Sequence, residues 1–189
     1  MPQLYMIGGP NGAGKTTVSK TLLPELLNCY EYVNADAIAA ALSPFAPETT
    51  ALQAGRLMLE RIHQLAEQKK DFAFETTMAS RSFAPFIKQC QQQDYQITPL
   101  YLWLEDPNLA VVRVHDRVRD GGHSIPDNVV LRRYKRSINN FLNIYTRLAD
   151  RWLLFDNSFN EPTMIAEKEL GGSLIVTNQN VWNKFKGTL

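Results

Sequence analysis

The hydrophobic positions of this 189-residue chain alternate between short apolar runs and longer amphipathic stretches. Five apolar runs of strand length predict buried β-strands, and the stretches between them repeat apolar residues every three or four positions, as helices do. The expected strands cover residues 3–9, 30–36, 71–77, 97–104 and 151–158. The expected helices cover residues 15–27, 48–69, 82–93, 107–119 and 127–150, and residues 171–185 add a short strand and a final helix.

Strands that alternate with helices predict right-handed β-α-β units and a parallel sheet, within one α/β domain that spans residues 1–189. In such sheets, ligands bind beyond the carboxyl ends of the strands. Polar residues follow each predicted strand, at 11–17, at Asn34 and Asp36, at 75–77, at Glu105 and Asp106, and at 156–158. The sequence therefore predicts a binding site along this edge of the sheet.

Composition narrows the class of protein. Hydrophobic residues make up 44% of the chain and charged residues 21%, which is typical of an ordinary globular protein. No apolar run approaches the roughly 20 residues of a membrane helix, and the first residues lack the pattern of a signal peptide. Cys29 and Cys90 are expected to be free thiols in a reducing cytosol. We therefore expect a cytoplasmic protein that does not associate with a membrane.

The loop after the first strand carries the strongest motif. Residues 9–16 read GPNGAGKT and fit the pattern G-x-x-x-x-G-K-[ST] at every fixed position, between a predicted strand and a predicted helix. The glycines let backbone amides wrap around phosphates, Lys15 reaches the β- and γ-phosphates, and the Thr16 hydroxyl binds Mg²⁺. We expect ATP or GTP to be bound with Mg²⁺ by Gly9, Pro10, Asn11, Gly12, Ala13, Gly14, Lys15, Thr16 and Thr17.

The polar residues after the second and third strands are the next candidates. The Asp36 carboxylate would lie beside the phosphates, where it could accept a proton from a substrate hydroxyl or reach Mg²⁺; the alternative is that it caps the helix beginning there. Glu75 occupies the place where P-loop ATPases and GTPases usually carry an Asp. With Thr76 and Thr77 it offers a surface that can hydrogen-bond a polar substrate, and the alternative is an exposed strand end.

A basic segment follows the fourth strand. The range Arg113–Arg136 holds seven Lys or Arg residues and only three acidic residues, around a Gly-Gly connection. A lid at about residues 113–136 would explain it, because lid arginines neutralise the transferring phosphoryl group and closure excludes water. A solvated basic face or a nucleic-acid patch are the alternatives. Arg132 and Arg136 lie away from the apolar stripe of their helix, whereas Arg133 lies at its edge; His123 is expected to form hydrogen bonds within the lid.

These motifs together resemble the zeta-toxin family of P-loop kinases. The resemblance rests on GGPNGAGKTT, VNAD, FETT, RVHDRVRDGGHSIPDNVVLRRYKRS and FDNS, and covers about residues 3–160. It implies a three-layer P-loop kinase fold, with a parallel five-stranded sheet in the order 2-3-1-4-5, helices on both faces and a lid after the fourth strand. It also implies phosphorylation of the sugar 3′-hydroxyl of UDP-N-acetylglucosamine with ATP and Mg²⁺, as in characterised zeta toxins.

Residue roles follow from the resemblance where the motifs match. Lys15 and Thr16 become the nucleotide and metal residues, and Asp36 becomes the base toward the sugar hydroxyl. Glu75 and Thr77 match residues that hold the sugar nucleotide. The first lid arginine is Arg117 or Arg119, and because His123, Ser124 and Ile125 stand where longer toxins have a second arginine, Arg132 or Arg133 takes that role. The chain itself does not specify an antitoxin partner.

Three hypotheses of function follow. The leading one is an ATP-dependent kinase of a small hydroxylated metabolite, with UDP-N-acetylglucosamine as the best single acceptor. The second is a polynucleotide or nucleoside kinase whose basic lid contacts backbone phosphates. The third is an NTP-dependent switch or binding module, which the Glu in place of the usual Asp and the lid arginines disfavour. Nucleic acid is thus not the expected partner.

Overall fold

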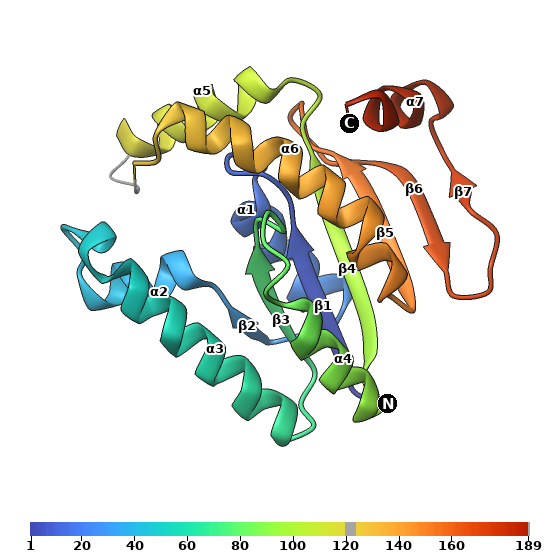
Figure 1. Cartoon of the computed structure of the whole chain (residues 1–189), viewed down its shortest axis with the longest axis horizontal. Helices are drawn as coiled ribbons and strands as arrows, with labels where there is room; N and C mark the ends of the chain where they lie inside the picture. The colour runs from blue at the N-terminus through green and yellow to red at the C-terminus, as the bar shows by residue number, and fades with distance from the viewer. Residues whose placement is uncertain (120–123, 189) are drawn as a thin grey trace.

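The computed structural model describes residues 1–119 and 124–188, and these residues form a twisted sheet with helices on both faces (Figure 1). The sheet order is β2-β3-β1-β4-β5-β6-β7. The first five strands are mutually parallel, which confirms the expected order 2-3-1-4-5. The strands are β1 Gln3–Gly8, β2 Glu31–Val33, β3 Phe72–Thr76, β4 Gln96–Trp103, β5 Arg151–Asp156, β6 Thr163–Glu169 and β7 Ile175–Val176.

The expectation of five strands was wrong, because β6 and β7 extend the sheet at the β5 edge. Both added strands are antiparallel to their neighbours, so the sheet is mixed. No strand was predicted over β6, whose sequence TMIAEKE has few residues of high strand propensity. Two ion pairs support its pairing with β5: Arg151 of β5 lies 2.6 Å from Glu167 and 3.7 Å from Glu169 of β6.

The helices correspond closely to the sequence pattern. Their bounds are α1 Lys15–Thr21, η1 Leu22–Leu26, α2 Ala35–Leu42, η2 Pro47–Thr50, α3 Ala51–Glu67, α4 Ala84–Gln92, α5 Pro107–Arg119, α6 Asp127–Asn143, η3 Tyr145–Arg147 and α7 Gln179–Gly187. The first helix changes to π geometry at η1, because Pro24 has no N–H for the regular i→i−4 bond. The helix expected over 127–150 ends at Asn143, so its last turn was wrong.

Asp127 is the first residue of α6 but does not cap it. The cap position is Pro126, and no side chain bonds the first amides of the helix. Instead, the Asp127 carboxylate lies 2.7 Å from His115 Nε2 of α5. This contact joins the two helices of the basic segment across the connection between them.

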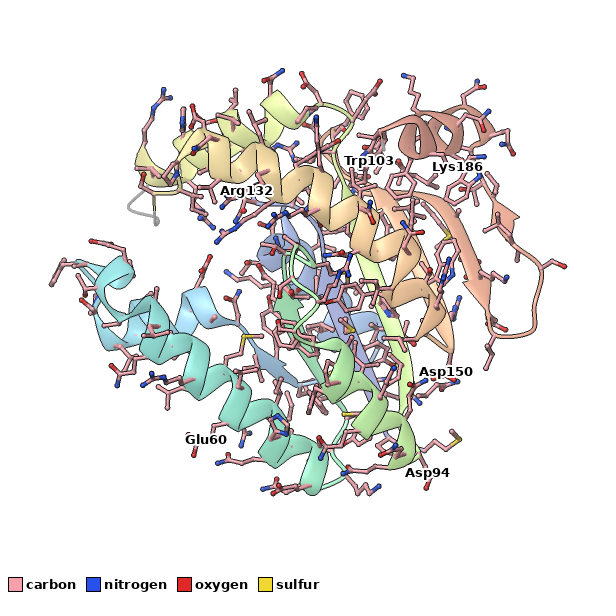
Figure 2. All side chains as sticks on the ribbon, in the orientation of Figure 1. Glu60, Asp94, Trp103, Arg132, Asp150 and Lys186 are labelled. Atoms are coloured by element: carbon pink, nitrogen blue, oxygen red, sulfur yellow. The ribbon has the colours of Figure 1, made fainter. Side chains whose placement is uncertain are left out.

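Successive side chains of a strand point to opposite faces of the sheet, so the protein has a hydrophobic core on each face. In β1, Leu4 and Met6 face the larger core, whereas Ile7 faces a smaller one on the opposite side of the sheet. Buried residues of α3, α4 and α6 fill the larger core, and η1 with its neighbours covers the smaller one. At the carboxyl end of β4, Trp103 packs edge-on against Phe185 of α7 (Figure 2).

Side chains of α6 and the turn after it fix the loop that follows β3. Three of them donate hydrogen bonds to carbonyl oxygens of this loop: Ser137 to Thr77 at 2.5 Å, Asn140 to Met78 at 2.8 Å and Tyr145 to Ser80 at 2.5 Å. These hydrogen bonds therefore connect α6, the second helix of the basic segment, to the loop at the carboxyl end of β3. Within the described ranges, no helix has both the length and the apolar character needed to cross a membrane.

Candidate active site

The glycine-rich loop joins β1 to α1. It is packed against β4, against α5 and against Asn157, the residue that follows β5. Gly12 and Gly14 have φ angles of 76° and 78°, in the left-handed region that favours glycine. A Cβ on Gly12 would lie 2.7 Å from the carbonyl oxygen of Ala110 in α5, and one on Gly14 would lie 2.5 Å from Asn157 Nδ2. These glycines are thus required by the protein's own packing, in addition to any ligand. The expected residues Gly9, Pro10, Asn11, Gly12, Ala13 and Gly14 form this loop, and Lys15, Thr16 and Thr17 form the first turn of α1.

Lys15 is buried inside the curve of the loop. Its Nζ donates to the carbonyl oxygen of Pro10 at 2.9 Å and lies 3.8 Å from Glu75 Oε1. Burial lowers the pKa of Lys15, and the negative charge of Glu75 opposes that shift. A phosphate bound in the loop would supply a further negative charge to this buried ammonium group.

Glu75 is the centre of a hydrogen-bond cluster at the end of β3. Its Oε2 accepts hydrogen bonds from Thr16 Oγ1 at 2.8 Å, from Tyr32 Oη at 2.5 Å and from Asn34 Nδ2 at 2.9 Å. The structure therefore brings Glu75 against the glycine loop. Thr77 is directed differently: its hydroxyl accepts from the Ala79 N–H at 3.4 Å and closes the turn after β3.

Asp36 does not cap α2, so that alternative was wrong. The cap is Asn34, whose Oδ1 accepts from the backbone N–H groups of Asp36 at 2.8 Å and Ala37 at 3.2 Å. The Asp36 carboxylate is thereby left exposed, 3.3 Å from Arg117 Nη1 of α5. Because both side chains are largely exposed, this ion pair contributes little to stability.

A pocket of about 330 Å³ lies beside this pair. Its polar residues are Thr16, Asn34, Asp36 and Arg117. The rest of its wall comes mainly from small apolar residues of α2, η2 and their surroundings, namely Ala35, Ala37, Ala39, Ala40, Pro44, Pro47 and Ala51. The pocket therefore combines a carboxylate, a guanidinium and the hydroxyl of the glycine-loop motif with an apolar surface that could hold an acceptor molecule.

The arginines of the basic segment divide into different environments. Arg117 lies at the pocket, whereas Arg119 is highly exposed and pairs with Asp116 at 3.1 Å. Arg133 is half-buried on α6, and Arg132 is exposed on the same helix (Figure 2). His123 lies outside the described residues. Of the two candidates for the first lid arginine, the geometry therefore favours Arg117.

Three residues that the structure places in or behind the site had no individual role in the sequence predictions. Asn157, at the end of β5, is buried and donates from Nδ2 to the Ala13 carbonyl at 2.8 Å. Arg113 holds that same strand end by donating to the carbonyl oxygens of Asn157 at 2.8 Å and Ser158 at 2.9 Å. Tyr32 supports Glu75. The only sequence signal for Asn157 was a polar residue after a strand, and Tyr32 had none.

The donor set at the loop fits Mg²⁺. Within residues 1–119 and 124–188, no group of three or more His, Cys, Asp or Glu side chains forms a site made of protein ligands alone. Thr16 and Glu75 instead provide neighbouring oxygen atoms beside the loop. Mg²⁺ in nucleotide sites usually takes few protein oxygens and completes its shell with phosphates and water, so these residues suit it.

Comparison with known proteins gives the family. The family model described as zeta toxin matches residues 1–162, which is most of the chain. The chain belongs to the zeta toxin family. It is therefore a P-loop kinase, as the resemblance to this family implied.

The individual relatives are distant. An uncharacterised protein of Haemophilus influenzae is 25% identical over 126 residues, which cover 67% of this chain and 88% of that protein. The AvrRxo1-ORF1:AvrRxo1-ORF2 structure with sulphate ions has a TM-score of 0.80 at 17% identity, covering 98% of this chain and 63% of the other. The PezAT chromosomal toxin–antitoxin system of Streptococcus pneumoniae has a TM-score of 0.72 at 13% identity, covering 99% and 79%. These two structures are similar in fold, and this chain spans less than two thirds of the AvrRxo1 chain.

Proposed function

We propose that this kinase transfers the γ-phosphoryl group of ATP to a hydroxyl of a small metabolite, and that its acceptor is the sugar 3′-hydroxyl of UDP-N-acetylglucosamine. The observation that carries the proposal is the pocket that Asp36, Arg117 and Thr16 share. It lets a carboxylate face a hydroxyl acceptor next to the phosphate loop. A related fold, the AvrRxo1-ORF1:-ORF2 structure, has been solved with ATP, which supports ATP as the donor.

The donor half of the site would be formed by the glycine loop and Lys15. Backbone amides of residues 9–14 surround the phosphates, and buried Lys15 exchanges its bond to the Pro10 carbonyl for the β- and γ-phosphates. Mg²⁺, when bound, neutralises developing charge on the phosphates. Thr16 would hold it through the side-chain hydroxyl. Transfer then depends mainly on position and electrostatics, as in other phosphoryl transfers.

In the acceptor half, Asp36 would act as the base. Its carboxylate accepts the proton of the acceptor hydroxyl while that oxygen forms a bond to the γ-phosphorus. The bond from phosphorus to the β–γ bridging oxygen breaks, and ADP leaves. Arg117 lies 3.3 Å from the carboxylate, close enough to orient it and to neutralise charge on the moving phosphoryl group.

ATP-dependent metabolite chemistry and two free thiols also favour a location in the cytoplasm.

The substitution Asp36→Asn tests the base. It keeps the size of the side chain and leaves the Asn34 cap intact, so we expect ATP affinity within about twofold of the original. Loss of the base should lower kcat by about 10²- to 10⁴-fold. Isothermal titration with ATP and a coupled assay of ADP release in the presence of UDP-N-acetylglucosamine measure the two quantities.

Asp116→Asn is the matched control, because Asp116 is also an exposed carboxylate paired with an α5 arginine. It should leave kcat unchanged. Full transfer activity in Asp36→Asn would reject Asp36 as the base. A loss of activity in both variants would indicate that activity depends on the carboxylate partners of the α5 arginines in general, and not on Asp36 as a base.

A further inference from the structure

The contacts of Glu75 place it on the nucleotide side of the site. The Thr16 hydroxyl donates to Glu75 Oε2 at 2.8 Å, and Glu75 Oε1 lies 3.8 Å from Lys15 Nζ. The pocket beside Asp36 is lined by Thr16 and Asn34, but neither Glu75 nor Tyr32 is among its lining residues. The side chain expected from the family resemblance to hold the sugar nucleotide is thus directed at the two residues that meet phosphate and metal.

The direction of the Thr16 hydrogen bond matters for metal binding. A hydroxyl has one proton and two lone pairs, and a metal ion can be bound only through a lone pair. Thr16 gives its proton to Glu75 and accepts a hydrogen bond from Asn34 Nδ2 at 3.3 Å, so one lone pair of its oxygen is left for a metal ion. The carboxylate also adds negative charge one hydrogen bond away from the metal position, which favours a divalent cation.

Two further residues hold Glu75 in this orientation. Tyr32 donates to Oε2 at 2.5 Å, and Asn34 Nδ2 donates to the same atom at 2.9 Å. Burial raises the pKa of Tyr32, and the Glu75 charge raises it further, so Tyr32 stays protonated and keeps its donor. The Asn34 amide cannot turn over, because its Oδ1 is engaged as the cap of α2.

We propose that Glu75 positions the Thr16 hydroxyl for Mg²⁺, and that Tyr32 and Asn34 are the positioning residues that hold Glu75 for this task. The inference rests on the proposed function only in assuming that nucleotide binds to the loop with Mg²⁺. It assigns the Tyr32–Asn34–Glu75–Thr16 cluster to the donor half of the site. The acceptor half is then left to Asp36, Arg117 and the small apolar pocket.

The test measures metal dependence of nucleotide binding, which requires no turnover. Isothermal titration with a non-hydrolysable ATP analogue is run in excess Mg²⁺ and again in EDTA, and the ratio of the two dissociation constants gives the preference for the metal-bound nucleotide. Tyr32→Phe removes only the hydroxyl, and Asn34→Ser keeps a capping oxygen while removing the amide donor without adding charge. Because each variant removes one hydrogen bond to the Glu75 carboxylate, we expect each to reduce the preference about tenfold.

Tyr30→Phe is the matched control, since Tyr30 is two residues from Tyr32 and exposed. It should leave the preference unchanged, and affinity in EDTA should stay the same in all variants. An unchanged preference in Tyr32→Phe, with a raised KM for the acceptor, would overturn the inference and return Glu75 to the acceptor. If Asn34→Ser fails to fold, Tyr32→Phe decides alone. Failure of Asp36→Asn to lose transfer would reject the proposed base without changing this ratio, so the two failures are distinguishable.

Discussion

Removing the Asn157 side chain should loosen the phosphate loop. Asn157 Nδ2 donates to the Ala13 carbonyl at 2.8 Å, and both residues are buried. In Asn157→Ala this carbonyl keeps its burial and loses its donor, which costs about 1–3 kcal/mol. The Arg113 bonds to the carbonyl oxygens of Asn157 and Ser158 use the backbone, so they survive the substitution and the end of β5 stays in place.

If the cost falls on the conformation that binds phosphate, ATP affinity drops about fivefold to about a hundredfold, because 1.4 kcal/mol is a factor of ten. If part of this free-energy cost destabilises the folded protein as a whole, the free energy of unfolding decreases by the same amount. Isothermal titration with Mg-ATP and urea unfolding measure the two shares, whose sum should lie near the cost given above.

Asn139→Ala serves as the control. Asn139 is exposed on α6, where its side chain contacts only Asn143 among the described hydrogen bonds, at 3.1 Å. It should change neither quantity by more than about 0.5 kcal/mol. If Asn157→Ala binds ATP and unfolds like the original protein, the interpretation of Asn157 as the support of the loop is wrong.

Two other predictions concern the acceptor pocket and the buried thiols. Ala40→Phe places a ring in the pocket of about 330 Å³, so it should raise the KM for the acceptor at least about tenfold and leave the affinity for ATP unchanged. If the variant weakens acceptor and ATP binding equally, the division of the site into a donor half and an acceptor half is wrong. Burial raises the pKa of Cys29 and of Cys90 from 9.0 to about 11. The folded protein therefore holds these protons more tightly than the unfolded chain, and its free energy of unfolding should fall between about pH 9 and about pH 11. Urea unfolding across that range checks the sign, Cys90→Ala should reduce the slope, and a rise in stability would refute the reasoning.

The sequence predicted what depends on local pattern. Five strands and the glycine loop follow from apolar runs and from a motif with a known mechanism, whereas the order of the parallel strands came from the family resemblance. β6 was missed because its residues have weak strand propensity and are held by pairing with β5, which is a tertiary interaction.

The supports of the site were harder to predict than its motif. Tyr32 sits in a strand and Asn157 lies 144 residues from its partner Ala13, so neither role is visible until the strand ends meet in space. For Asp36 the local sequence left two alternatives open, a helix cap and a carboxylate of the site. Asn34 has the extended backbone and the short amide that a cap requires, which leaves the Asp36 carboxylate for the pocket.

We propose that this member of the zeta toxin family phosphorylates a nucleotide sugar. The most direct measurement is mass spectrometry of UDP-N-acetylglucosamine after incubation with the protein and Mg-ATP, beside a pool of other nucleotide sugars, nucleosides and RNA ends. We predict a gain of one phosphoryl group on UDP-N-acetylglucosamine, at the sugar 3′-hydroxyl, and none with Asp36→Asn. Phosphorylation of an RNA end or a nucleoside instead, or ADP release that no acceptor changes, would contradict the account.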